Sequence, residues 1–87
     1  MSATITLHPY ITGAEIQLEV NGSTVGDCIA DAIKTYPAME GKIFAKPGKL
    51  KGYVEIYVNG NPTVPKELDY PVNDGDHINL LVYLAGG

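Results

Sequence analysis

The sequence predicts one α+β domain in which a single main helix packs on one face of a mixed sheet of four to five strands. Segments of alternating apolar and polar residues occur near both ends of the chain, and one segment between them has helical spacing of its apolar residues. The 87 residues can form one hydrophobic core but leave no room for a second. We therefore expect residues 1–87 to be a single domain.

The first half of the chain is expected to form a hairpin followed by the helix. Residues 4–8 and 15–20 alternate between apolar and polar side chains, with Gly13 in the connection. Ser23 or Thr24 can cap a helix over residues 25–36, and Pro37 ends it. Apolar residues recur at helical spacing and give this helix one apolar stripe, formed by Val25, Ile29, Ala32, Ile33 and Tyr36.

The second half is expected to hold a long loop and the remaining strands. Residues 38–52 contain three glycines, a proline and four lysines without a clear period, which predicts a loop with one short turn. A strand follows at residues 53–58, and a short strand is expected near Thr63 and Val64. Prolines make the next stretch irregular, and a turn at residues 73–76 leads into a last strand over residues 77–85.

Alternation assigns the strand side chains to two faces. The face toward the helix is expected to carry Ile5, Leu7, Ile16, Leu18, Val20, Val54, Ile56, Val58, Ile78, Leu80 and Val82. The opposite face is expected to carry Thr4, Thr6, Gln17, Glu19, Glu55 and Asn79, together with Tyr53, Tyr57, Leu81 and Tyr83. The last four are unusual on a face bathed in water. Either the long loop covers them, or they form a partner-binding patch, because aromatic anchors are enriched at interfaces.

Composition argues against several partners and compartments. The net charge is −4, with six lysines and no arginine, so we expect no nucleic-acid partner. No apolar stretch is long enough to span a bilayer and no signal segment precedes the first strand, so we expect a cytoplasmic protein without membrane contact. Four lysines fall within residues 42–51, whereas residues 67–87 carry four acids and no lysine. The sequence thus predicts an acidic end at the C-terminus, which would favour a basic partner.

No catalytic or metal-binding pattern is present. The glycines form neither a P-loop nor a dinucleotide fingerprint, and His8 and His77 have no neighbouring ligands in the sequence. Asp74 and Asp76 flank Gly75 but lack the further acids of a calcium loop. Cys28 lies beside Ile29 in the predicted helix and is expected to be a small core residue; the alternative is a reactive thiolate near a helix start. We expect neither a bound metal nor a bound cofactor.

The most informative feature is the pair Gly86 and Gly87, which follows an apolar strand without a polar linker. Two residues without side chains form a thin, flexible backbone that can enter a channel too narrow for a Cβ, and an ionised carboxylate stands at its tip. The alternative is an inert, frayed end.

Taken together, the order of elements, the sequence Val72-Asn73-Asp74-Gly75-Asp76 and its distance from Ala85-Gly86-Gly87 resemble the ubiquitin-like sulfur carriers of the MoaD/ThiS type. The resemblance covers the whole chain and implies a β-grasp fold. It also implies that an E1-like adenylyltransferase, which uses ATP and Mg²⁺, activates the Gly87 carboxylate. The resulting thiocarboxylate would donate sulfur to a biosynthetic enzyme for molybdopterin or tungstopterin, thiamine thiazole or cysteine.

On this interpretation the chain is a carrier and not an enzyme, comparable to the small subunit of a molybdopterin synthase-like complex, and is a monomer when free. Its reactive end is Gly86 and Gly87, and its partner-binding residues are Tyr53, Tyr57, Leu81, Tyr83, Leu84 and Ala85. Two alternatives stay open. A ubiquitin-like modifier would use the same tail for isopeptide bonds, and a β-grasp binding module would not use the glycines at all.

Overall fold

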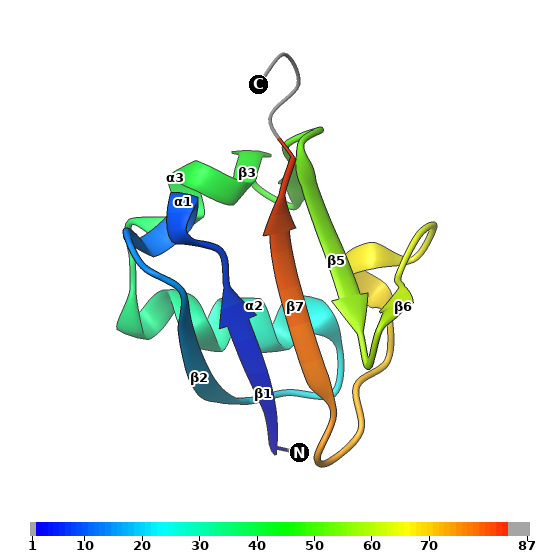
Figure 1. Ribbon diagram of the computed structural model, residues 1–87. Helices are drawn as coiled ribbons and strands as arrows, with labels where there is room; N and C mark the ends of the chain where they lie inside the picture. Colours follow the sequence, from blue (N-terminus) through cyan, green and yellow to red (C-terminus); the bar gives the residue numbers. More distant parts are fainter. Residues whose placement is uncertain (1, 84–87) are drawn as a thin grey trace.

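In the computed structural model, which describes residues 2–83, helix α2 (Val25–Thr35) crosses one face of a five-stranded mixed sheet (Figure 1). The strands are β1 (Ser2–Leu7), β2 (Ile16–Asn21), β5 (Val54–Val58), β6 (Asn61–Pro62) and β7 (His77–Val82), in the order β2-β1-β7-β5-β6. Only β1 and β7 pair in parallel. The predicted arrangement of one main helix on one face of a mixed sheet is confirmed.

Strand β7 lies at the centre of the sheet. It pairs with β1 on one side, where Leu80 faces Leu7, and with β5 on the other, where Val82 faces Val54. Because β7 is the last strand of the described residues, the described part of the chain ends at the centre of the sheet and not at an edge (Figure 1).

Helix α2 begins and ends close to where the sequence predicts. The Thr24 hydroxyl accepts a hydrogen bond from the Asp27 backbone N–H at 3.1 Å, which satisfies one of the free donors of the first turn. The buried residues of α2 recur at spacings of three and four, as an amphipathic helix requires: Val25, Cys28, Ile29 and Ala32. Tyr36 is the C-cap residue of α2 and directly precedes Pro37.

Two connections contain structure that the sequence analysis did not predict. The expected hairpin turn holds the short helix α1 (Pro9–Thr12), which buries Ile11 and ends at Gly13 with φ 87°. Residues 38–52, expected to be a loop, form helix α3 (Met39–Ile43) and the hairpin of β3 (Phe44–Lys46) and β4 (Lys49–Leu50). The loop prediction was wrong because α3 is a helix of five residues stabilised by burial of both ends, too short to show a period.

The segment after β5 also differs in detail. The short strand expected near Thr63 and Val64 is β6, which consists of the two residues before Thr63. Thr63 is instead buried, and its hydroxyl donates to the Ile56 carbonyl oxygen at 2.9 Å. A 3-10 turn, η1 (Glu67–Asp69), follows, and the chain then passes the start of α2, where the Val25 N–H donates to the Tyr70 carbonyl oxygen. Residues 84 and 85, expected to extend the last strand, lie outside the described residues.

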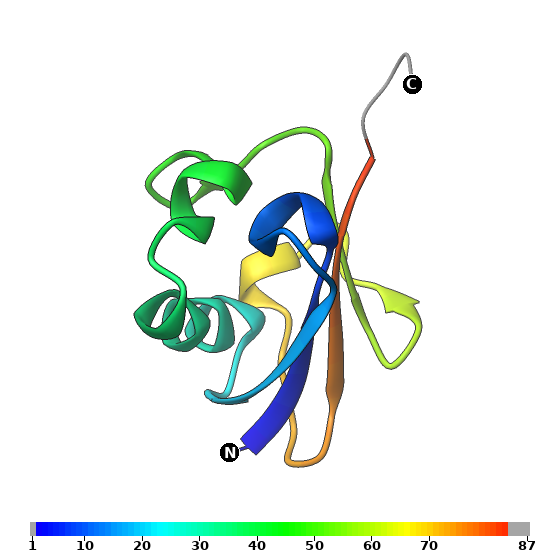
Figure 2. The same ribbon diagram turned by 60° about the vertical axis from the view of Figure 1, so that its left-hand side comes forward.

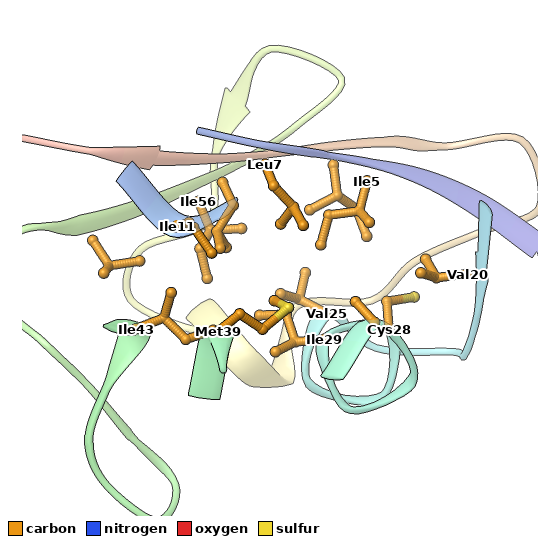
Figure 3. Packing of buried hydrophobic residues seen from close by; sticks show 14 of the residues in the cluster. Ile5, Leu7, Ile11, Val20, Val25, Cys28, Ile29, Met39, Ile43 and Ile56 are labelled. Atoms are coloured by element: carbon orange, nitrogen blue, oxygen red, sulfur yellow. The ribbon is translucent and has the colours of Figure 1, made fainter. Parts of the chain in front are cut away.

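The hydrophobic core lies between the sheet and the helices α2 and α3 (Figure 3). Every strand residue predicted to face the helix belongs to it or packs against it; Ile16 and Leu18 are only partly buried because β2 is an edge strand. Met39 and Ile43 of α3 are completely buried and extend the core beyond the end of α2. None of the helices within residues 2–83 is long and apolar enough to cross a membrane.

Candidate functional site: the root of the C-terminal tail and the open sheet face

The candidate site begins where the described chain ends. The Tyr83 N–H donates to the Tyr53 carbonyl oxygen at 2.7 Å, directly beyond the last pair of the β5–β7 ladder, Val54 and Val82. We call Tyr83 and this hydrogen bond the tail root. The sequence-predicted site residues Leu84, Ala85, Gly86 and Gly87 lie outside the described residues. The structure therefore places the root of the predicted tail, and the roles of the four tail residues stay predictions.

The sheet face opposite α2 carries three of the four predicted patch residues. Leu81 lies opposite Glu55 in the β5–β7 ladder, and Tyr57 lies opposite Asn79. Leu81 is partly exposed, whereas its neighbour Leu80 is fully buried on the other face. Tyr83 is 55% exposed. The predicted strand register is therefore correct, and Leu81, Tyr57 and Tyr83 form an open patch on the face away from the helix.

This open patch is not purely apolar. The pKa of the Tyr57 phenol is raised, first by the nearby Glu55 carboxylate, then by burial, and also by the neighbouring Tyr83 phenol. The two phenols therefore lie close together across the strands, with a carboxylate beside them. Such a surface offers a partner aromatic rings with hydroxyl tips, a combination that is enriched at protein interfaces.

Tyr53 does not join this patch. Its ring packs edge-on against Tyr10, with 6.0 Å between ring centroids and an interplanar angle of 83°. Its hydroxyl donates to the Lys42 carbonyl oxygen at 3.4 Å. Tyr53 was expected to lie with Tyr57 alongside Leu81 and Tyr83. Its ring packs against Tyr10 instead, because Tyr53 precedes β5 and strand alternation no longer fixes its direction. It belongs instead to a second cluster, formed by Tyr10, Lys42, Lys51 and Tyr53, which we call the cation–aromatic cluster.

The long connection does not cover the open patch. Figure 2 shows α3 and the β3–β4 hairpin (green) on the same side of the sheet as α2. Burial agrees, because Met39 and Ile43 of α3 are part of the core. The alternative that residues 38–52 cap the four predicted patch residues therefore fails for three of them and holds only for Tyr53.

Charge is distributed differently from the sequence-based prediction. Asp74 and Asp76 lie in the turn before β7, where the Ser2 N–H donates to Asp74 Oδ1 at 2.8 Å. This turn and Tyr83 lie at opposite ends of β7. Lys42 and Lys51 lie at the tail root, through their contacts with Tyr10 and Tyr53. The prediction of an acidic end at the tail is wrong for Asp74 and Asp76, because β7 carries the chain from one end of the sheet to the other. Glu67 and Asp69, in contrast, line a surface cavity together with Lys51.

Side chains with catalytic potential have local structural roles. Cys28 is fully buried, and burial raises the pKa of its thiol, with Asp27 and Asp31 adding to the effect. His8 Nδ1 accepts from the Tyr10 N–H at 3.0 Å at the start of α1, and His77 Nε2 lies 2.8 Å from the Thr6 hydroxyl. Within residues 2–83, no group of three or more His, Cys, Asp or Glu residues is arranged to hold a metal ion.

Comparison with known proteins matches this chain to one family. A model of the ThiS family matches residues 8–87. The sulfur carrier protein CysO of Mycobacterium tuberculosis is 32% identical over 84 residues, which cover 93% of this chain and 89% of that protein. Small archaeal modifier protein 1 of Haloferax volcanii is 27% identical over 73 residues, covering 83% of this chain and 80% of that protein.

A solved structure supports the same match. The structure of the BexX/CysO complex of Amycolatopsis orientalis contains a chain that is 28% identical to this one and superposes with a TM-score of 0.82. The superposition covers 98% of this chain and 99% of that chain. The predicted β-grasp fold and the predicted family resemblance are thereby confirmed.

Proposed function

Since the chain belongs to the ThiS family, we propose that it is a sulfur carrier whose Gly87 carboxylate is adenylated by an E1-like enzyme and then converted to a thiocarboxylate. The observation that carries this proposal is that the family match runs through the terminal glycines to residue 87. The fold adds physical support, because the last described residue stands at the end of the central strand, held by the backbone of Tyr53.

The chemistry needs nothing from this chain except the carboxylate. A carboxylate resists nucleophilic attack because it carries negative charge and has no good leaving group. Attack of its oxygen on the α-phosphorus of ATP releases pyrophosphate and gives an acyl adenylate. Hydrosulfide then adds to the carbonyl carbon, AMP leaves, and the resulting thioacid loses its proton to give the thiocarboxylate. ATP, Mg²⁺ and the catalytic groups belong to the E1-like adenylyltransferase.

The open patch is the proposed anchor for that enzyme and for the sulfur-accepting biosynthetic enzyme. Leu81 and Tyr83 stand on β7 immediately before the tail, so a partner that covers them also holds the tail root. Residues 84–87 can span at most about 14 Å when fully extended, at about 3.3–3.6 Å per residue. The partner's active site must therefore lie within about 14 Å of the surface that covers the patch.

The acceptor enzyme belongs to one of three biosynthetic classes: molybdopterin or tungstopterin, thiamine thiazole, or cysteine. A second candidate function is conjugation of Gly87 to lysines of other proteins. It is supported by the 27% identity to small archaeal modifier protein 1 and by the structural likeness to SAMP1 of Haloferax volcanii, with a TM-score of 0.78. Both functions begin with adenylation of the same carboxylate and differ only in the nucleophile that follows.

The test is intact-mass analysis after incubation with the E1-like enzyme of the same organism, ATP, Mg²⁺ and sulfide. We expect the mass change of one oxygen-to-sulfur exchange. Deletion of Gly87, or addition of one residue after it, should abolish the product while the thermal unfolding of the protein stays unchanged. Thiocarboxylate formation by the extended variant would refute the proposal. For the modifier alternative, a tail remnant on lysines of other proteins in a cell digest is the expected product.

A further inference from the structure

Four lysines lie in or directly after α3 and the β3–β4 hairpin, and two of them contact Tyr10 and Tyr53 beside the tail root. Lys42 lies in α3, Lys46 and Lys49 lie in the β3–β4 hairpin, and Lys51 follows that hairpin. Within residues 2–83, the one ion pair is elsewhere, between Lys34 and Asp31 at 3.9 Å. Among the described residues, none of these four ammonium groups lies within ion-pair distance of a carboxylate.

Two of the four lysines are held in place by aromatic rings. Lys42 Nζ lies 5.2 Å from the centroid of the Tyr10 ring and donates to the Tyr10 carbonyl oxygen at 3.1 Å. Lys51 Nζ lies 5.8 Å from the centroid of the Tyr53 ring. Because Tyr10 packs against Tyr53, the two ammonium groups are coupled into one cluster. An ammonium group that is already oriented loses less conformational entropy when it binds an anion.

The other two lysines face each other. Lys46 and Lys49 are direct partners in the β3–β4 ladder, and both are exposed. Like charges that stand directly opposite on paired strands destabilise the pair. The free chain therefore carries a small electrostatic cost in this hairpin, which a bound anionic group would relieve.

The charged side chains beside Tyr53 differ from those beside Tyr57. The pKa of the Tyr53 phenol is lowered by a hydrogen bond with Tyr10 and by the ammonium groups of Lys51 and Lys42. The pKa of Tyr57 is raised, chiefly by Glu55. Lysine ammonium groups therefore lie beside Tyr53, and a carboxylate lies beside Tyr57.

We propose that the four lysines, two of which are oriented by Tyr10 and Tyr53, dock an acidic segment of the partner protein beside the entrance that receives the tail. This inference rests on the proposed function, because it describes how the tail is delivered. The tail ends in a carboxylate, which an acidic partner surface would repel. Lysines at the tail root offset that repulsion and attract the partner's acidic residues, which raises the rate of association.

An acidic protein segment fits this surface better than a small anion. The four ammonium groups are spread over a helix, a hairpin and the residue after it, so they match a chain of carboxylates and not a single phosphate. Lys49 and Lys51 also line a surface cavity of about 540 Å³ with Lys66, Glu67 and Asp69. Among the described residues, Glu67 and Asp69 form no ion pair with these lysines. Their negative charge makes the cavity less favourable for a compact polyanion.

The first test measures association of the carrier with the E1-like enzyme by stopped-flow at low and high ionic strength. Lys46→Gln and Lys51→Gln should each lower the association rate about threefold at low salt, and the difference should vanish at high salt. Lys34→Gln removes the same charge from α2, where the side chain is 81% exposed, and should leave the rate near that of wild type.

Lys46→Gln has a second expected effect that a purely structural role would not produce. Because it removes the like-charge pair with Lys49, it should raise the Tm of the free protein by about 1–3 °C while it slows association. A variant that is more stable and slower to bind supports docking through the hairpin. Unchanged association of Lys46→Gln and Lys51→Gln, with normal sulfuration of wild type, would refute the docking inference alone.

A second test does not depend on the enzyme. A synthetic decapeptide of glutamate is titrated into the isotope-labelled protein, and amide chemical shifts are followed by NMR. We expect shifts at Tyr10 and over residues 42–53 that disappear in the Lys42→Gln/Lys51→Gln variant. If wild type is not sulfurated, the proposed function fails, and the peptide titration decides the docking inference by itself. Binding of a single-stranded oligonucleotide at these residues without peptide binding would overturn it.

Discussion

Cys28 is the one nucleophilic thiol of the chain, and its replacement separates sulfur chemistry at the terminus from sulfur chemistry at a side chain. The side chain is fully buried on the inner face of α2, next to Val20 (Figure 3). Cys28→Ala removes one sulfur atom from the core and leaves a small cavity. Lost burial and the cavity together should cost about 1–2 kcal/mol of unfolding free energy.

The expected change is large enough to measure in a domain of this size. A loss of 1–2 kcal/mol lowers the Tm by roughly 5–15 °C. Cys28→Ser should lose about 1 kcal/mol more, because a hydroxyl in an apolar core is costly unless it finds a hydrogen-bond partner. Thermal unfolding of both variants provides the measurement, with wild type as the reference.

Function should survive the same substitution. Cys28→Ala should still form the thiocarboxylate at a temperature below its own Tm. In wild type the thiol should react with a disulfide reagent only as the protein unfolds, because burial both shields it and raises its pKa. Rapid labelling of the folded protein, or a well-folded Cys28→Ala that cannot carry sulfur, would show that the thiol takes part in the chemistry.

Three further predictions follow from the register, the turn and one close approach. Leu81→Lys should weaken binding of the E1-like enzyme by at least about 2 kcal/mol with little change in Tm, whereas Leu81→Glu should also lose about 0.5 kcal/mol of stability because residue 81 faces Glu55. Calorimetry measures the binding and thermal unfolding measures the stability. A large stability loss for Leu81→Lys would contradict the strand register. Hydrogen bonds from Asn73 and Asn59 lower the pKa of the Asp76 carboxyl, so its contribution to the free energy of unfolding is present above the unfolded pKa of about 3.9 and is lost as pH falls through the lower folded value. In urea unfolding, Asp76→Asn should be about 1 kcal/mol less stable than wild type at pH 7, and its stability should fall less as the pH is lowered. An acid profile identical to that of wild type would rule this out. A Cβ on residue 22 would lie 2.6 Å from the Asp27 Cβ of α2, so Gly22→Ala should destabilise the protein by about 1–3 kcal/mol. A Cβ on residue 41 would meet nothing within 4 Å, so Gly41→Ala should be neutral or stabilising. Equal Tm values for the two variants would disprove the close approach at Gly22.

The strands and α2 were predictable from the sequence because each has a clear period. Alternation in residues 77–82 correctly separates Leu80 from Leu81, and the cap at Thr24 lies where a helix of this period begins. The same reasoning failed at α1 and α3. These helices have four and five residues, so their stability comes from burying Ile11, Met39 and Ile43 against the core and not from a local pattern.

The candidate site was predictable in part for the same reason. The open patch depends on alternation within two regular strands, and Leu81, Tyr57 and Tyr83 lie on the predicted face. Tyr53 stands one residue before β5, where its neighbours α1 and α3 decide its direction. Its partner Tyr10 belongs to α1, which the sequence does not predict, so no local signal could have identified the cation–aromatic cluster.

The charge of the tail end shows why proximity in sequence is a poor guide to electrostatics in this fold. Asp76 precedes the six residues of β7, and a strand of that length places it about 20 Å from the tail root. Lys42 is forty-one residues before Tyr83 in the chain but reaches the tail root through Tyr10 and Tyr53. At 20 Å, more than twice the Debye length of about 8 Å at physiological salt, the acidic turn contributes little to the potential at the tail. A partner that covers the tail root therefore also meets Lys42 and Lys51, and charge complementarity favours an acidic partner surface there in place of the basic one that the linear sequence suggests.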